Sequence, residues 1–461
     1  MQDLANFAIE ASLKAGAQFC DIRIENSQVT MIEIDNKVTK TANSLRKKGA
    51  GIRAFVDGAW AFAHTATLTK KALQEIGRQV SRLAKAVVPH VPQKKDLDGP
   101  TYEGLVRSEA EPSVLDVSFE EKLSLARQVD ESARSYDDRI ANARSYYRDQ
   151  LTNLYVANSL GTSVWNEISQ IVMYSTAVAK EADNRQEAIK VKGFTAGFEK
   201  PIIDQFVELG HQSAELAIDL LSSTAVKGDT YNVILNPDLT GLLIHEAFGH
   251  ACEADNLLSH TTILEDRIGA ALGPEYLSIS DDPTIPKAFG SFAYDWEGTK
   301  AKKRFLVKNG ILSEFLHNLE TASTTNAEGN GAARAQDFMY PPICRMSNTL
   351  IEPSDWKYDE MLADTREGLM LCDSVYGYCS PSDGMFTFRT HHGYRIENGE
   401  KTGIVRGTSL AGQILDILEK IKAVGNELHF FPGGCGKWWQ YAAVMSGGPY
   451  VRVDNIPVGG I

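Results

Sequence analysis

The chain has 461 residues, of which 43% are hydrophobic and 23% charged, and its formal net charge at pH 7 is −13. A chain of this length holds two to four domains with ordinary buried cores, and its composition excludes collagen-like, disordered and disulfide-scaffold proteins. An acidic surface repels phosphate groups, so we expect no direct binding to nucleic acid or to anionic membranes. Six cysteines are too sparse for a disulfide framework in a chain this long.

The beginning of the chain shows neither the basic n-region nor the apolar h-region of a signal peptide. Its apolar stretches also fall far short of the roughly 18 residues that a membrane-spanning helix needs. We therefore expect a cytoplasmic protein with reduced thiols and no attachment to a membrane.

The first unit is predicted to be an α+β domain over residues 1–88. Apolar residues recur at helical spacing from Leu4 to Ala17. They then alternate between turn signals over residues 20–64, which predicts three or four strands. Helical spacing returns after that, with Thr67 or Thr69 placed to cap a second helix.

A proline-rich segment separates this unit from the next. Residues 89–117 contain four prolines and little periodicity, which indicates a linker. A middle α+β domain is predicted over residues 118–227. It opens with a helix at Ser118, where Glu121 three residues on completes a capping-box pattern, and continues with strand-like runs and a closing helix.

The third unit, residues 228–461, is rich in strand signals but contains one distinctive helix. That helix is expected to begin at Asn236-Pro237, an N-cap followed by proline. Further on, Asn309-Gly310 and Asn398-Gly399 lie between apolar residues and predict hairpins. The predicted fold class is α+β: two smaller α+β units are followed by a large, mostly antiparallel β domain that carries the metal-binding helix described next.

This helix contains the sequence His245-Glu246-x-x-x-His250. Two neutral imidazoles can bind zinc, and a neighbouring carboxylate can accept a proton from water on the metal. Residues five apart point roughly 140° apart on a regular α-helix, so the two rings would face different walls. A single π-type turn would restore a common face, and Gly249 makes such a distortion easier. We therefore predict an irregular helix here, although ordinary polar residues of an amphipathic helix would give the same letters.

A catalytic zinc site needs a third protein ligand. Cys435 lies between glycines that allow close backbone approach, and Lys437 nearby would favour its thiolate, although a lone cysteine can also be a small buried residue. Glu253 is in addition a candidate acceptor for an imidazole N–H, or else a solvated helix residue. Spacing does not choose among the candidates, which are Cys435, His391, His392, His429 and Glu253.

Several segments together resemble one known family. They are LLIHEAFGHACEAD, GNGAARAQ, ICRMSNTLIEP, GYRIENGEKTGIVRGTSLAG, ELHFFPGGCGKWWQ and RVDNIPVGGI. In this order they are similar to the TldD/PmbA family, which is also labelled a modulator of DNA gyrase. The family contains a peptidase subunit, TldD, and a partner subunit without the metal motif, called TldE or PmbA. Since this chain has both the HExxxH motif and the late CGK cysteine, it resembles the TldD-like metallopeptidase subunit.

The resemblance implies a zinc peptidase that cleaves unfolded or small peptides. It assigns the zinc ligands to His245, His250 and Cys435, and the role of general base to Glu246. It also implies a paired assembly around a chamber, formed with a PmbA/TldE-like partner subunit or with a second copy of the chain. The chain departs from the family pattern at Trp438-Trp439, where a small, glycine-containing stretch is more usual, and in the segment VYGYCSPSDGMF.

Substrate is expected to bind as an added strand on a sheet edge, with candidate edges near residues 330–350. One alternative function is a non-catalytic regulatory or partner subunit in which the metal only braces the third domain. A factor that acts directly on DNA fits poorly with the net charge of −13.

Overall fold

The computed structural model describes residues 1–91 and 97–460. The linker predicted over residues 89–117 therefore lies partly outside the described residues, as does residue 461 at the end of the third predicted unit. The predicted α+β class with extensive antiparallel sheet is confirmed. None of the described helices has the length and apolarity that crossing a membrane would require.

The strands of the first two predicted units form one continuous seven-stranded sheet. Its order is β3-β2-β1-β5-β6-β4, with β7 also paired to β6. β1 and β5 pair antiparallel from Asp21 opposite Asn158 to Asp35 opposite Arg144. β4 lies within the segment predicted as a linker and pairs in parallel with β6. The strands are β1 (Phe19–Asp35), β2 (Val38–Val56), β3 (Ala59–Thr65), β4 (Glu103–Val106), β5 (Ile140–Asn158), β6 (Ser163–Glu181) and β7 (Asn184–Phe194).

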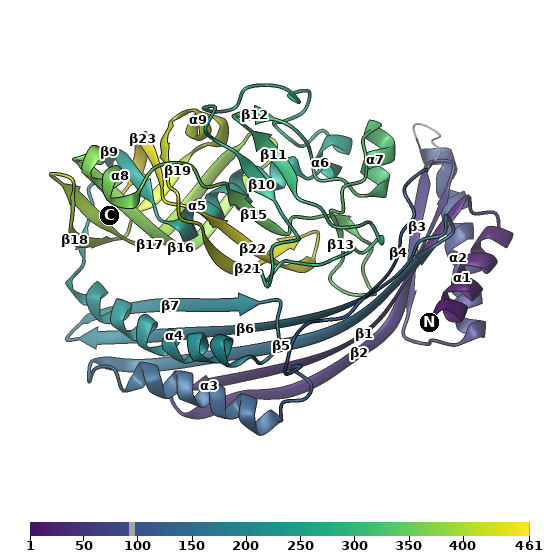
Figure 1. Cartoon of the computed structure of the whole chain (residues 1–461), viewed down its shortest axis with the longest axis horizontal. Helices are drawn as coiled ribbons and strands as arrows, with labels where there is room; N and C mark the ends of the chain where they lie inside the picture. Colours follow the sequence, from purple (N-terminus) through teal and green to yellow (C-terminus); the bar gives the residue numbers. More distant parts are fainter. Residues whose placement is uncertain (92–96, 461) are drawn as a thin grey trace.

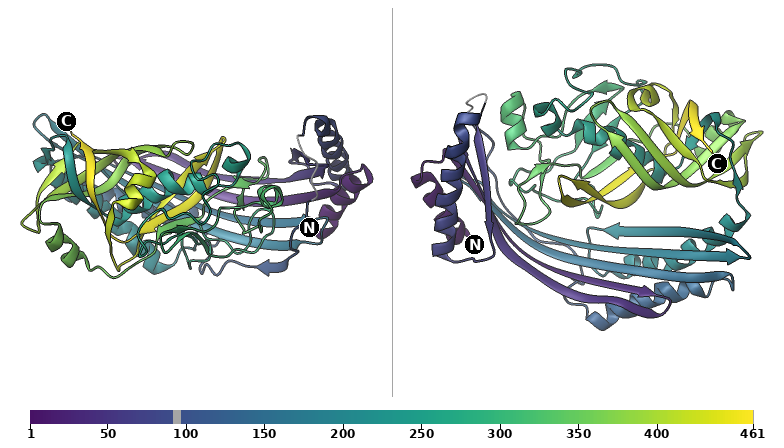
Figure 2. Two further views of the ribbon diagram at one scale, coloured as in Figure 1. Left: turned by 90° about the horizontal axis from the view of Figure 1, so that it is seen from above. Right: turned by 180° about the vertical axis from the view of Figure 1, so that it is seen from behind.

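Four helices cover the outer, convex face of this long sheet, and the C-terminal domain lies on its concave face (Figures 1 and 2). The helices are α1 (Gln2–Lys14), α2 (Lys70–Val87), α3 (Phe119–Arg134) and α4 (Lys200–Asp219). The predicted caps are confirmed, because the Thr69 side chain accepts a hydrogen bond from the backbone N–H of Ala72, and Ser118 forms a complete capping box with Glu121.

The C-terminal domain contains two larger sheets and a two-stranded ribbon, β13-β14. A six-stranded sheet has the order β12-β11-β10-β15-β22-β21. An eight-stranded sheet has the order β16-β9-β23-β19-β17-β18-β8, with β20 added to β23, and further pairing of β16 with β17 closes five of its strands into a ring. Both predicted Asn-Gly hairpins are confirmed, as the turns β11–β12 and β17–β18.

The strands of this domain are β8 (Thr224–Ala225), β9 (Asp229–Leu235), β10 (Ile279–Asp281), β11 (Arg304–Lys308), β12 (Ile311–Leu312), β13 (Ala333–Arg334), β14 (Ile343–Cys344), β15 (Asn348–Ile351), β16 (Gly368–Ser380), β17 (Met385–Glu397), β18 (Glu400–Arg406), β19 (Ser409–Gln413), β20 (Ile421–Val424), β21 (His429–Lys437), β22 (Gln440–Gly448) and β23 (Val451–Gly459). Its helices are α5 (Pro237–Leu243), α6 (Asp255–Leu258), α7 (Leu319–Thr325), α8 (Tyr358–Thr365) and α9 (Ile414–Glu419).

Helix α5 packs against β22 and β21 of one sheet and against β16 of the other. Its apolar residues Leu239 and Leu243 belong to the largest cluster of buried apolar side chains in the described chain. Burial of this cluster holds α5, and the turns that follow it, at a fixed place between the sheets.

Candidate metal centre

The helix that carries the predicted metal motif changes its winding within the motif. α5 begins as predicted, with the Asn236 side chain accepting a hydrogen bond from the backbone N–H of Leu239 at 2.9 Å. It is followed by a π-helical segment, η3 (Ile244–Gly249), and a short 3₁₀ turn, η4 (His250–Cys252). The predicted irregularity is confirmed.

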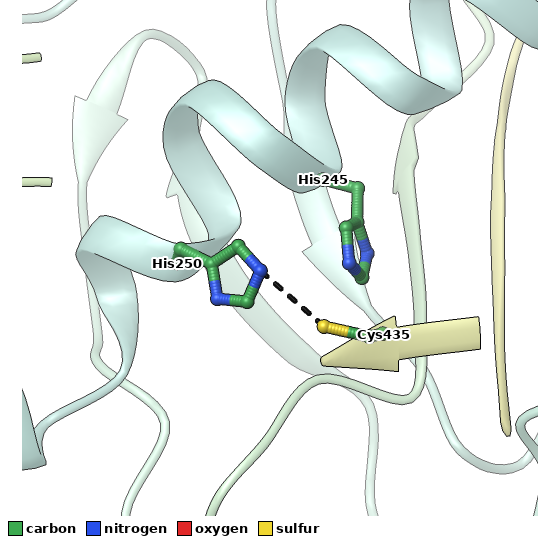
Figure 3. Close-up of side chains that lie close together, drawn as sticks. All are labelled: His245, His250 and Cys435. Carbon is green, nitrogen blue, oxygen red and sulfur yellow. Dashed lines mark hydrogen bonds between the residues drawn. The ribbon is translucent and has the colours of Figure 1, made fainter. Parts of the chain in front are cut away.

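The wider π turn brings the two histidines to one side. The ring centroids of His245 and His250 are 5.3 Å apart (Figure 3). Strand β21 brings Cys435 to the same point, with its Sγ atom 3.3 Å from Nε2 of His250. One ligand atom from each of these three residues lies within 4.8 Å of the others, and the rest of residues 1–91 and 97–460 holds no comparable group of His, Cys, Asp or Glu side chains.

The other candidate histidines lie elsewhere. His391, His392 and His429 line a cavity of about 980 Å³. Nε2 of His391 lies 2.9 Å from the carbonyl oxygen of Glu187, a contact with the long sheet. The structure thus groups Cys435, and none of these three histidines, with the HExxxH pair. The same cavity reaches close to the motif, because its walls include Leu242, four residues before Glu246.

Glu253 is fully buried behind His250. Its Oε2 atom lies 2.8 Å from Nδ1 of His250 and 3.0 Å from Nζ of Lys437. Lys437 in turn donates a hydrogen bond to Asp255 at 2.6 Å. The expectation that Lys437 would favour the Cys435 thiolate is therefore not supported, because two carboxylates already pair with its ammonium group.

The charges around the centre are mutually stabilising. Burial alone would raise the pKa of Cys435, but His250 and His245 outweigh it and hold that pKa well below its usual value. Burial also opposes ionisation of Glu253, yet Lys437 and His250 lower its pKa to about 2. The two histidines, and not Lys437, thus favour the thiolate of Cys435. The thiolate is the form in which cysteine binds metals.

The remaining residue of the motif, Glu246, is partly exposed beside the cluster. Its Oε2 atom lies 3.7 Å from Nε2 of His250, which is the nitrogen that faces Cys435. The thiol of Cys379, from the end of β16, lies 3.9 Å from the same oxygen. The carboxylate therefore stands next to the three donor atoms with a side open to solvent.

Arg345 supports the centre, and sequence reasoning did not single it out. It is buried and donates hydrogen bonds to the carbonyl oxygens of Cys435, at 2.6 Å, and Gln440, at 3.3 Å. It therefore ties together the two strands on either side of the β21–β22 turn. The signal that could have found it is its place in ICRMSNTLIEP, one of the segments on which the family resemblance rests.

The three donor residues suit zinc. Two imidazoles and a thiolate are ligands that a borderline-soft divalent ion prefers, and three protein ligands are the number found at catalytic zinc sites. In addition, the Nδ1 atom of His245 is buried and has no hydrogen-bond partner among the described residues, so the chain alone leaves this ring incompletely satisfied.

Comparison with known proteins shows family likeness along almost the whole chain. Residues 228–460 match the family described as the PmbA/TldA metallopeptidase C-terminal domain. Residues 112–221 match the central domain of the same family, and residues 20–84 match its domain 1.

Two relatives and two solved structures agree with this. A metalloprotease of Methanocaldococcus jannaschii is 34% identical over 448 residues, covering 96% of this chain and 97% of that one. A protein of Saccharolobus solfataricus named zinc metalloprotease TldD homolog is 26% identical, covering 98% and 99%. A proposed modulator of a DNA gyrase from Thermotoga maritima has a TM-score of 0.82 at 22% identity, covering 99% and 100%. TldE from Thermococcus kodakarensis has a TM-score of 0.79 at 17% identity, covering 98% and 99%, so both structures establish the fold.

Proposed function

We propose, from the premise that this chain belongs to the PmbA/TldD metallopeptidase family, that it is a zinc-dependent peptidase acting on small or unfolded peptides in the cytoplasm. The observation that carries the proposal is the meeting of His245, His250 and Cys435, whose donor atoms lie within 4.8 Å of one another beside Glu246. The π turn and the strand that make this meeting come from regions of the chain almost two hundred residues apart.

In this proposal His245, His250 and Cys435 hold the ion. Zinc supplies Lewis acidity when bound, which polarises a peptide carbonyl and makes a water molecule more acidic. Glu246 acts as the general base: its carboxylate accepts a proton from the attacking water and then delivers that proton to the leaving amine. Glu253, hydrogen-bonded to Nδ1 of His250, fixes the orientation of that ring.

The substrate is proposed to bind as an added strand on β21. β21 is the last strand of the six-stranded sheet and pairs only with β22 among the described residues. In the region expected to provide the edge, β15 is an interior strand between β10 and β22, whereas β13 and β14 pair only with each other among the described strands. Among these edges β21 is preferred for the proposal because it carries Cys435 and belongs to the larger sheet.

The backbone of β21 is open to another strand around Cys435. Lys437 and Gln440 flank a two-residue turn, and such flanking residues form a hydrogen-bonded pair. Along an antiparallel ladder, hydrogen-bonded pairs alternate with pairs that are not hydrogen-bonded. The backbone N–H and C=O groups of Gly436 and Gly434 therefore point away from β22. Glycine at both positions keeps side chains out of the way of an approaching peptide backbone.

The assembly is proposed to be a pair, with either a TldE-like subunit or a second copy as partner. The likeness of this fold to the solved structure named TldE supports a shared architecture for the two subunits.

Elemental analysis, combined with cleavage of an unstructured peptide, tests the proposed function. We expect about one zinc per chain and hydrolysis that a chelator abolishes. Glu246→Gln should keep zinc and lose hydrolysis, whereas Cys435→Ala should lose both. If the wild-type chain carries zinc but cleaves no peptide, alone or with its partner subunit, the centre is structural and the peptidase proposal is wrong.

A further inference from the structure

The turn between β21 and β22 consists of two tryptophans in an unfavourable backbone conformation. Trp438 has a φ of 47° and Trp439 a φ of 63°, both in the left-handed region. Two-residue hairpin turns with positive φ normally use Asn-Gly, because bulky L-residues are disfavoured there. The other such turns of the described chain all have Asn or Asp first, and most have Gly second; they are Asn36-Lys37, Asp57-Gly58, Asn309-Gly310 and Asn398-Gly399.

The side chains of this turn gain little burial within the chain. Trp438 is 59% exposed and Trp439 is 96% exposed. Exposed indole rings and a left-handed backbone both cost free energy in the free protein. Strain and apolar exposure that coincide at one turn indicate a surface that a ligand completes.

The turn projects from a rigid base. Lys437, the last residue of β21, is fixed by Glu253 at 3.0 Å and by Asp255 at 2.6 Å, and its ammonium group lies 5.1 Å from the centre of the Trp438 ring. On the other strand, Nε2 of Gln440 donates a hydrogen bond to the carbonyl oxygen of Pro341 at 3.0 Å. The indoles are therefore presented at a set distance from the candidate metal centre.

That distance corresponds to three or four residues of an extended peptide. Trp438 and Trp439 follow Cys435 by three and four positions on the hairpin, and a strand rises about 3.3 Å per residue, so the turn lies about 10 Å beyond the cysteine. The hairpin is on the face of the C-terminal domain that looks onto the long sheet (Figure 1). Two residues further on, Tyr441 lines a hollow of about 410 Å³ shared with that sheet.

We infer that the Trp438-Trp439 turn is a binding site for one apolar side chain of the peptide substrate, three to four residues from the bond that is cleaved. The inference rests on the proposed peptidase function and on strand addition to β21. An aromatic or large aliphatic side chain would bury the indole faces and so offset the exposure seen in the free chain. The turn would thereby add a preference to a binding mode that otherwise reads only backbone.

The double variant Trp438→Asn/Trp439→Gly tests this inference with little risk to the fold. Asn-Gly is the sequence that two other hairpin turns of this chain use, at Asn309-Gly310 and Asn398-Gly399, so the variant should unfold at the same temperature as the wild type or higher. A host peptide of glycine and serine is made with a single Phe moved along it, and cleavage sites are mapped by mass spectrometry. The wild type should cut the peptide three or four residues from Phe, wherever Phe is placed. In the variant the cleavage site should no longer depend on the position of Phe.

Binding is measured separately in the Glu246→Gln background, so that it does not depend on turnover. Affinity for the Phe-containing peptides should fall about tenfold in the double variant, while affinity for the all-polar host peptide stays the same. Leu105→Ser is the control, since it removes another exposed apolar side chain, on β4, and should change neither affinity.

The inference would be overturned if the double variant still cut three or four residues from Phe and kept its affinity for the Phe-containing peptides. It would also be overturned by a change in oligomeric state with unchanged peptide affinity, because the turn would then be a subunit contact. Failure of the wild type to cleave any peptide would count against the proposed function instead, and the binding measurement would still decide the role of the two tryptophans.

Discussion

Gly249 lies directly against the sulfur of Met346, so that a Cβ atom on the glycine would stand 2.1 Å from Met346 Sδ. The backbone of Gly249 has ordinary helical angles, φ −59° and ψ −43°. Glycine is therefore needed here for close packing of the π turn and not for an unusual conformation, which differs from the flexibility expected from the sequence.

Gly249→Ala should destabilise the fold by about 1–3 kcal/mol, the usual cost of overpacking a core. The free energy of unfolding, measured in urea, checks this. In a Met346→Ala background the same change should cost much less, because the clashing sulfur is gone. Gly329→Ala is the matched control, since nothing lies within 4 Å of its Cβ position. Equal costs in both backgrounds would show that the contact with Met346 is not the cause.

Glu253→Gln should lower zinc affinity by about 10- to 100-fold, the usual effect of losing a carboxylate that orients a ligating histidine. Glu253 Oε2 lies 2.8 Å from Nδ1 of His250, and an amide is a weaker hydrogen-bond acceptor than a carboxylate. Competition with a chromophoric chelator measures the affinity.

Asp255→Asn is the control for this prediction. Asp255 is the other carboxylate that pairs with Lys437, but in the structure the hydrogen bond to Nδ1 of His250 comes from Glu253 and not from Asp255. A similar loss of zinc affinity in both variants would mean that the Lys437 pairs, and not the bond to His250, matter for the metal.

Part of the site could be predicted from local sequence. A spacing of five between His245 and His250 requires a wider helical turn if both are to bind one ion, so the π-helical segment could be predicted. Asn236-Pro237 marks the start of the helix, which could be predicted as well. Cys435 was one of five candidates for the third ligand, and only the family resemblance selected it, because local sequence does not determine which of several distant residues will lie beside a helix.

What the sequence did not predict depends on pairing between distant strands. β1 and β5 are more than one hundred residues apart, yet their pairing merges two predicted units into one sheet. The position of β21 at the sheet edge likewise follows from the order of all six strands. Lys437 was expected to act on its near neighbour Cys435, but Glu253 and Asp255, close only in the fold, bind it instead.

Asp281 and Arg304 form a fully buried ion pair that fixes the sheet behind the centre. The second carboxylate oxygen of Asp281 accepts hydrogen bonds from the backbone N–H of Ser347 and the hydroxyl of Thr349, both at 2.8 Å. Asp281→Ala should cost about 3–5 kcal/mol of stability, because it leaves the Arg304 guanidinium buried and unpaired.

The melting temperature measured by calorimetry checks this loss. Asp204→Ala is the comparison, since Asp204 pairs with Lys200 at 2.9 Å on an exposed helix face and should cost about 0.5 kcal/mol or less. A loss for Asp281→Ala no greater than that of the exposed pair would contradict the role given to the buried one.

Burial of Glu25 in the long sheet makes the stability of the fold depend on pH. It is almost fully buried on β1, and burial, with a further contribution from Asp337, raises its pKa from 4.5 to about 7. The folded pKa exceeds the unfolded one, so ionisation favours unfolding, and stability is lost as pH rises from about 4.5 through 7.

Glu25→Gln removes the group that ionises and keeps its shape and its contact with Ser27, whose hydroxyl lies 3.1 Å away. Above pH 7 the variant should be more stable than the wild type by an amount on the order of 2 kcal/mol, and below pH 4.5 this advantage should vanish. Urea unfolding at pH 4.5, 6 and 8 measures the difference. Glu33→Gln, at a partly exposed position on the same strand, is the matched control. If Glu25→Gln is destabilising at pH 8, the carboxylate makes favourable interactions that outweigh its burial, and the proposed origin of the pH dependence is wrong.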